Sequence, residues 1–179
     1  RYDPDDPAVN IIDMSENEIE VPEDYAAEEL RPDVLCYTTP PLAADAVITG
    51  DCSVELFISS DAEDTDFIVR VTEATPDGKS IKLADGVMDV KYRNSFEKPE
   101  FMEPDGIYEV SIRTTKLSNT FKAGHQMRFT VTSGAKNFMF PNSNTENGFD
   151  SEVNRIAHNT ICRGGMQASH ILVPAEKRA

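Results

Sequence analysis

From Val34 onward the chain is a series of short runs in which apolar and polar residues mostly alternate. Alternation with a period of two, in runs rich in β-branched and aromatic residues, predicts strands that are buried on one face and wet on the other. A final apolar run is closed by Pro174. The predicted strands are 47–49, 53–58, 66–72, 107–112, 126–132 and 171–173.

Turn signals separate these runs, and no long amphipathic pattern lies among them. Glycine and Asp or Asn supply the backbone conformations of tight reversals. The predicted turns are 76–78, 85–86, 104–106 and 123–124. Short strands at this spacing predict an all-β fold, an antiparallel β-sandwich or jelly roll.

The first 33 residues have a different pattern. Between Asp13 and Asp33 there are nine acidic residues and one base, Arg31. Prolines at 4, 7, 22 and 32 limit any helix to a turn or two. We therefore interpret residues 1–33 as an irregular acidic lead-in whose charges form a solvated face, and residues 34–179 as the β domain.

Charge narrows the range of functions. With 17 Lys and Arg against 32 Asp and Glu, the formal net charge is −15, which argues against nucleic acid and anionic membranes as partners. No apolar run reaches the ~20 residues that cross a bilayer. Three widely spaced cysteines suggest neither a disulfide framework nor a metal clamp, so the expected compartment is the cytoplasm. The start reads as the middle of a longer chain, and we expect a fragment.

Motifs of catalysis are absent from the sequence. There is no G-x-S-x-G elbow, no phosphate-binding glycine loop and no H-E-x-x-H, and the three histidines stand far apart. The acid-rich loop 61–66 departs from the EF-hand calcium template. Asp64 and Asp66 are instead expected to accept backbone N–H groups before the strand at Phe67. We therefore predict no catalytic residue, no metal and no cofactor.

The loop 137–148 begins with three large apolar side chains, Phe138, Met139 and Phe140, beside several asparagines. Exposed aromatic rings near asparagines can stack on sugars, which would suit a lectin-like module. The alternative, which we favour, is that these side chains plug the end of the sandwich or contact another domain.

Seven motifs in order along the chain resemble the C-terminal domain of the X-Pro dipeptidyl-peptidases and cocaine-esterase-like acyl hydrolases. The opening Tyr2-Asp3-Pro4 also resembles the segment that leads into that domain. The motifs are Asp33–Leu42, Ile48-Thr49-Gly50, Asp64-Thr65-Asp66-Phe67, Pro76-Asp77-Gly78, Tyr92-Arg93, Gly124–Arg128 and Ser169–Pro174.

The resemblance implies a galactose-binding-like jelly roll in which Asp64, Thr65, Asp66 and His125 are structural, with the His125 ring bonding backbone. It also implies that the serine, aspartate and histidine of catalysis lie on a preceding α/β-hydrolase domain of the same parent chain. Two positions depart from the pattern: Asp89 replaces a usual arginine, and the segment 9–12 replaces a Pro-Thr-x-Gly-Gly motif.

The predicted function is that of a non-catalytic accessory domain of a serine hydrolase, of peptidase or acyl esterase type. It would pack on the hydrolase domain and help to shape the substrate cleft; self-association into a homo-oligomer stays open. Aromatic residues and arginine are favoured at interfaces. The candidate contact residues are Phe67, Tyr92, Arg93, Phe138 and Phe140. The alternative is a free-standing carbohydrate-binding β-sandwich module.

Overall fold

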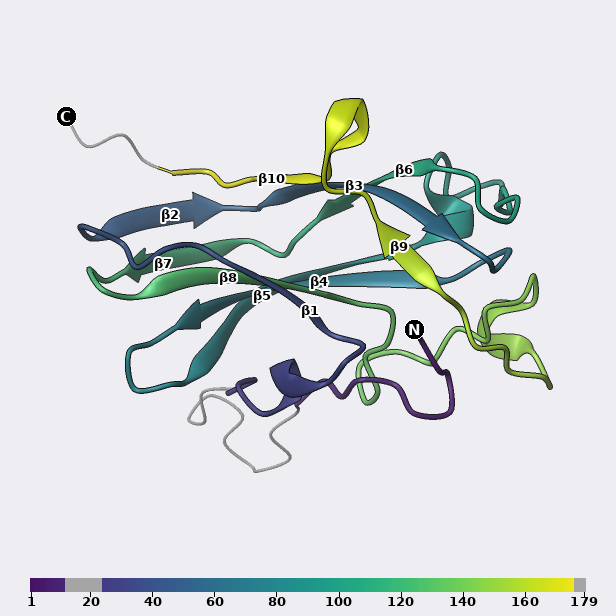
Figure 1. The fold of residues 1–179 in the computed structure, drawn as a ribbon, viewed down its shortest axis with the longest axis horizontal. Helices are drawn as coiled ribbons and strands as arrows, with labels where there is room; N and C mark the ends of the chain where they lie inside the picture. The colour runs from purple at the N-terminus through teal and green to yellow at the C-terminus, as the bar shows by residue number, and fades with distance from the viewer. Residues whose placement is uncertain (12–23, 176–179) are drawn as a thin grey trace.

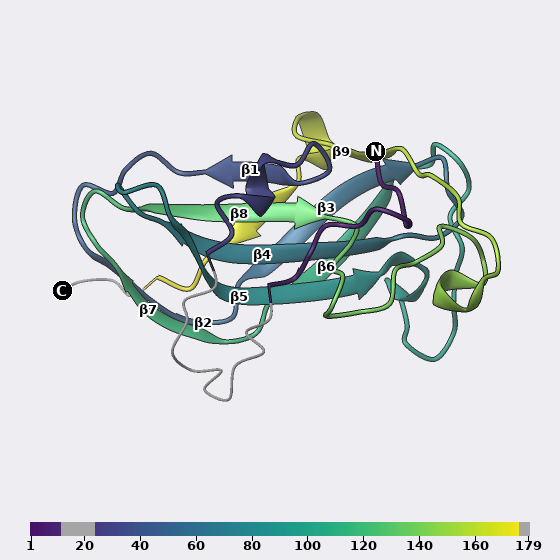
Figure 2. The same ribbon diagram turned by 90° about the horizontal axis from the view of Figure 1, so that it is seen from below.

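The computed structural model describes residues 1–11 and 24–175 and consists of antiparallel strands arranged in two layers (Figures 1 and 2). One sheet has the order β1 (Leu35–Thr38), β8 (Gln126–Thr132), β4 (Asp66–Ala74) and β5 (Ser80–Asp89). The other has the order β10 (His170–Leu172), β3 (Ser53–Ser60) and β6 (Tyr108–Arg113), and β9 (Asn159–Ile161) pairs with a further part of β3. A two-stranded sheet joins β2 (Ala46–Gly50) to β7 (Leu117–Phe121).

Four single turns of 3-10 helix lie in the connections that the structure describes. They are η1 (Glu28–Leu30), η2 (Val90–Tyr92), η3 (Gly148–Asp150) and η4 (Gly165–Gln167). No described helix is long and apolar enough to span a membrane.

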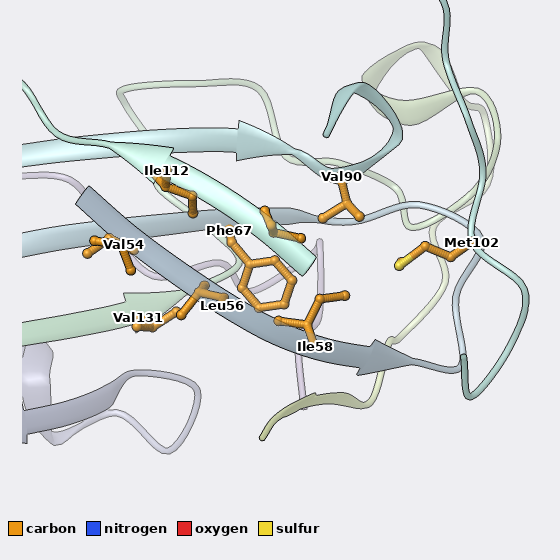
Figure 3. Close-up of a cluster of buried hydrophobic side chains, with 10 residues drawn as sticks. Val54, Leu56, Ile58, Phe67, Val90, Met102, Ile112 and Val131 are labelled. Atoms are coloured by element: carbon orange, nitrogen blue, oxygen red, sulfur yellow. The ribbon is translucent and has the colours of Figure 1, made fainter. Parts of the chain in front are cut away.

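The core lies between the two layers and is built from the inward faces of β3, β4, β6 and β8. In β3 every second residue is buried, as the alternation predicts, so Val54, Leu56 and Ile58 face inward. The Phe67 ring lies among them (Figure 3). A second cluster, which includes Ile48 and Phe121, fills the end of the molecule near β2 and β7.

Strand β4 is buried on both faces, because the lead-in covers the outer one. Arg70 points outward from β4, and its guanidinium carbon lies 3.7 Å from the centroid of the buried Tyr25 ring. Both side chains donate hydrogen bonds to Asn10 Oδ1, from Arg70 Nη2 at 3.1 Å and from the Tyr25 hydroxyl at 2.9 Å. The described parts of the lead-in therefore pack on the sheet.

The interpretation of the acidic run as a solvated face is wrong for Glu29. This residue is 9% exposed. Its carboxylate accepts hydrogen bonds from Ser80 Oγ at 2.6 Å and from Arg128 Nη1 at 2.5 Å. These partners compensate the charge that burial would otherwise destabilise. The acids from Asp13 to Glu23 lie outside the described residues.

All six predicted strands are confirmed, although most of their ends differ. Four further strands were not predicted: β1, β5, β7 and β9.

The turn predicted at 85–86 is wrong, because both residues lie inside β5. Gly86 serves a different purpose there. A Cβ atom on this residue would lie 2.5 Å from the backbone oxygen of Arg113, so the glycine lets β6 approach β5 closely.

Candidate functional site

Three connections meet at one end of the sandwich, which we call the loop end (Figures 1 and 2). They are residues 61–65 between β3 and β4, residues 90–107 between β5 and β6, and residues 133–158 between β8 and β9. Backbone hydrogen bonds join the first two connections, from Val90 N–H to the Thr65 carbonyl (3.0 Å) and from Met102 N–H to the Glu63 carbonyl (2.8 Å). The loop end is therefore a hydrogen-bonded unit.

A buried polar cluster joins all three connections. The Lys91 ammonium lies 2.7 Å from Asp64 Oδ2 and 2.9 Å from Asp89 Oδ2, and the Asp64 side chain is fully buried. The Lys91 backbone N–H also donates to Asp64 Oδ1 at 3.1 Å. From the third connection, the Asn142 amide donates to Asp64 Oδ2 and to Asp66 Oδ1, both at 3.0 Å. One lysine and one amide thus hold three carboxyl groups together.

Gly148 makes room for the Lys91 ammonium. Its φ is +56°, and a Cβ atom there would lie 2.8 Å from Lys91 Nζ. Since Asp64 and Asp89 fix the ammonium in place, a side chain at this position would displace it, in addition to the strain of a left-handed backbone. A side chain at position 148 would therefore disturb the packing of the third connection over the cluster.

Burial sets the protonation of the cluster. It raises the pKa of Asp66 to about 8; the hydrogen bond from Asn142 opposes this shift, and the charges of Asp89 and Asp64 add to it. Burial and the neighbouring Asp64 raise the pKa of Asp89 to about 6, against the influence of Lys91. Burial would lower the Lys91 pKa, but the hydrogen bonds to Asp64 and Asp89 outweigh it and raise that pKa. The ammonium therefore stays charged, while Asp66 keeps its proton at neutral pH.

We expect Asp66→Asn to become progressively more stable than the wild type as the pH rises. The Asp66 pKa is about 8 in the fold and ~3.9 in an unfolded chain. Between these values the folded state binds more protons, so the wild type loses stability as pH increases, and asparagine removes this titration. Urea unfolding at pH 5, 6.5 and 8 measures the difference. The exposed Asp150→Asn is the control, and a pH-independent difference for Asp66→Asn would contradict the assignment.

Beside the cluster, the third connection presents an apolar surface. Phe140 is 76% exposed and Phe149 is 71% exposed, and their rings stack with centroids 5.8 Å apart. Further exposed apolar side chains come from the connections at this end: Phe96, Phe101, Ile107, Phe138, Val153 and Ile156. A concentration of exposed large apolar residues marks a site of interaction.

The predicted contact residues differ in their exposure. Phe138 and Phe140 are exposed at the loop end, as the interface hypothesis requires. The expectation for Phe67 is corrected: the ring is 2% exposed and belongs to the core, because it lies on the inward face of β4.

Tyr92 and Arg93 hold their own connection together. Tyr92 is half-buried, with the Lys91 ammonium 5.5 Å from its ring centroid. The Arg93 guanidinium lies 4.6 Å from the Tyr108 ring centroid and donates to the Val90 carbonyl. Their contacts therefore serve the architecture of the loop end more than an outer surface.

Asp64, Thr65 and Asp66 are buried. Asp64 accepts a backbone N–H as expected, that of Lys91 on a different connection, whereas Asp66 accepts a side-chain amide instead of a backbone N–H. Thr65 is buried, and its hydroxyl accepts a hydrogen bond from Asn159 Nδ2 at 3.2 Å. Among the described residues, no three His, Cys, Asp or Glu side chains are placed to hold a metal ion.

His125 lies at the opposite end of the sandwich, just before β8. Its Nδ1 is 2.7 Å from Glu73 Oε1 on β4. The ring therefore bonds a side chain, whereas a bond to the backbone was expected.

The sequence interpretation missed Lys91 and Phe149 as members of the loop end, and it noted Asp89 only as a departure from the family pattern. The spacing Asp89-x-Lys91 is the sequence signal that could have pointed to the lysine.

Comparison with known proteins places the chain among hydrolase domains. It is 37% identical over 182 residues to the cocaine esterase of Rhodococcus sp. (strain MB1 Bresler), an alignment that covers 99% of this chain and 32% of that protein. The chain thus spans about a third of the length of this curated relative.

Two solved structures share the fold. An aminopeptidase from the marine sediment archaeon Thaumarchaeota archaeon matches with a TM-score of 0.89 at 23% identity, over 98% of this chain and 32% of that one. An α-amino acid ester hydrolase matches with a TM-score of 0.88 at 21% identity, over 97% of this chain and 31% of that one. Residues 4–172 match the family described as the X-Pro dipeptidyl-peptidase C-terminal non-catalytic domain, and the chain belongs to this family.

Proposed function

We propose that this chain is the accessory domain of a larger serine hydrolase that acts on esters, other acyl compounds or X-Pro peptides. The domain would use its loop end to pack on an α/β-hydrolase domain and to wall part of the substrate cleft. A galactose-binding-like jelly roll is the arrangement that we propose for its sandwich. Phe138 and Phe140 are the residues from the sequence interpretation that we propose for the contact.

One observation carries this proposal: exposed aromatic rings stand on a loop end whose polar cluster is buried and mutually bonded. A preformed surface loses little conformational entropy when it binds, and aromatic side chains provide much of the binding energy at interfaces. An interface between domains of one chain typically buries ~600–1,500 Å². Three connections at one end of the sandwich can supply such a surface.

We expect the double substitution Phe138→Ser and Phe140→Ser to weaken docking by about 2–4 kcal/mol, because each ring would lose a buried contact. The measurement is the affinity between this domain and the separately produced hydrolase domain, by calorimetry. The matched control is Leu172→Ser, which removes an exposed apolar side chain of β10 away from the loop end.

Equal effects of the test and control substitutions would contradict the proposed docking surface. A different result would contradict the non-catalytic role. In that case the purified chain would hydrolyse activated esters at enzyme-like rates and lose this activity on substitution of one of its own serines.

The alternative of a sugar-binding module uses the same exposed rings. Phe138 and Phe140 would then stack on pyranose faces, and a glycan array would show binding that is lost in Phe138→Ser or Phe140→Ser. The family match over residues 4–172 supports the accessory domain instead.

A further inference from the structure

The loop end contains a pocket that both acidic and apolar residues line. The acidic residues are Asp66 and Asp89, and the apolar ones are Met139, Phe140 and Phe149. Asn142 completes the lining, and the cavity volume is about 240 Å³. Pockets for drug-sized ligands are larger, at ~300–1,000 Å³. The volume therefore suits a small ligand or the head group of a single side chain.

The two carboxyl groups are direct neighbours across the sheet. Asp66 begins β4 and Asp89 ends β5, and the register of the two strands places them opposite each other. Like charges directly opposite each other in a sheet are destabilising. This pairing is therefore unfavourable unless a proton or a cation compensates it.

The one cation bonded within the described cluster, the Lys91 ammonium, pairs with Asp64 and Asp89 and acts on Asp66 only through its charge. Lys91 lies between Asp64 and Asp89, and three carboxyl groups with one ammonium leave an excess of negative charge. Asp66 is 3% exposed and lines the pocket. Its Oδ1 accepts the neutral Asn142 amide, and within the described part of the chain its Oδ2 has no hydrogen-bond donor.

The aromatic side of the pocket is also suited to a cation. Phe140 and Phe149 stack at an interplanar angle of 25°, and both contribute to the lining. The face of an aromatic ring carries partial negative charge and attracts organic cations within about 6 Å. Once both carboxyl groups are ionised, they and the two aromatic rings around one cavity are complementary to an alkylammonium or guanidinium group and not to an anion or a neutral sugar.

We propose that the pocket between Asp66, Asp89 and the Phe140–Phe149 pair binds an organic cation, an alkylammonium or guanidinium group. The cation supplies the positive charge that Asp66 lacks in the described structure. Two sources present this chemistry: a free small molecule, or a lysine or arginine side chain of the hydrolase domain. This inference does not depend on the docking proposal, since a free cation can bind to the chain alone.

The pocket should bind the cation more tightly as the pH rises from about 6 to 8.5. Asp66 must give up its proton to pair with the cation. The charged and titratable groups around Asp66 are Asp64 on the first connection, Asp89 at the end of β5, Lys91 after β5, and Tyr2 from the lead-in. Asp64 and Asp89 favour a bound cation, Lys91 opposes it, and the Tyr2 phenol is neutral. The net charge of these groups is negative, so together they favour a bound cation.

The experiment titrates the purified chain with tetramethylammonium chloride at constant ionic strength and follows the ring signals of ¹³C-labelled phenylalanine by NMR. The neutral control probe is tert-butanol, which has a similar shape and no charge. We expect saturable shifts of the Phe140 and Phe149 signals with tetramethylammonium, and weaker binding by a factor of ten or more for tert-butanol, on the order of one lost ion pair.

Three variants test the residues. At pH 8.5, where most Asp66 is ionised, Asp66→Asn should weaken tetramethylammonium binding about tenfold, and Phe149→Leu about threefold. Asp150→Asn, which removes an acid outside the pocket, should leave it unchanged. Asp89→Arg places a guanidinium next to Asp66, as in the family pattern, and should abolish binding, so it tests the proposal even if Asp66→Asn folds poorly.

The proposal is overturned if tetramethylammonium causes no saturable shift, if tert-butanol binds equally well, or if Asp89→Arg binds as the wild type does. A second titration, on the hydrolase chain that carries the domain, identifies the source. Binding that persists there supports a free cation, and binding that is lost supports a side chain of the hydrolase domain. Docking of the two domains can persist when the titration fails, so the two proposals fail independently.

Discussion

Lys91→Met is expected to lower the free energy of unfolding by about 3–5 kcal/mol, the cost of removing one partner of a buried ion pair. The ammonium lies 2.7 Å from the fully buried Asp64 carboxylate and 2.9 Å from Asp89. Methionine keeps most of the aliphatic stem but leaves three carboxyl groups around an amide. The loss should be largest above pH 7 and should shrink toward pH 4, because protonation then removes the uncompensated charge.

The matched control is Lys122→Met. Lys122 lies 3.1 Å from Asp45, but its side chain is 60% exposed. Pairs of this kind contribute about 0–1 kcal/mol. Urea unfolding of both variants at pH 5 and 7.5 measures the contrast. Equal losses, or a loss in Lys91→Met that does not depend on pH, would contradict the role that we assign to the buried cluster.

Gly86→Ala should destabilise the domain by about 2–3 kcal/mol or more, in the upper range of overpacking substitutions. The added Cβ would lie 2.5 Å from the Arg113 backbone oxygen and 2.9 Å from Ile112 Cγ2, so β5 and β6 must separate. Backbone atoms within a sheet cannot give way as the end of a flexible side chain can.

Gly164→Ala is the control for Gly86→Ala, because no atom lies within 4 Å of its added Cβ. Thermal unfolding followed by circular dichroism compares the two variants. A melting temperature of Gly86→Ala that equals that of Gly164→Ala would show that the close approach of the strands has no energetic consequence.

Gly86 also shows why part of the fold could not be predicted. Asp-Gly is a turn signal when only neighbours in sequence are considered, and the strand β6 that requires the glycine begins 22 residues later, at Tyr108. The alternation in β3 was easier to interpret, since one face meets the core along its whole length. Strand β4 shows no such contrast in burial, because the lead-in also covers its outer face, where Arg70 lies.

The candidate site was predictable in part. The apolar head of the loop 137–148 singled out Phe138 and Phe140, either to plug the end of the sandwich or to contact another domain, and both are exposed. The Asp64–Lys91 pair was not predictable, because a separation of 27 residues becomes a contact only when the first two connections of the loop end meet. Phe67 was assigned to an interface from its residue type alone, and burial depends on the face of the strand that carries it.

The central claim is that the loop end of this non-catalytic domain packs on a hydrolase domain. Hydrogen–deuterium exchange of the chain alone and of the chain joined to the hydrolase domain tests it most directly. We expect added protection in residues 93–107 and 137–156 and none in the hairpin turns at 75–79 and 122–125. Protection confined to those turns, or exchange that does not change at the loop end, would contradict the account.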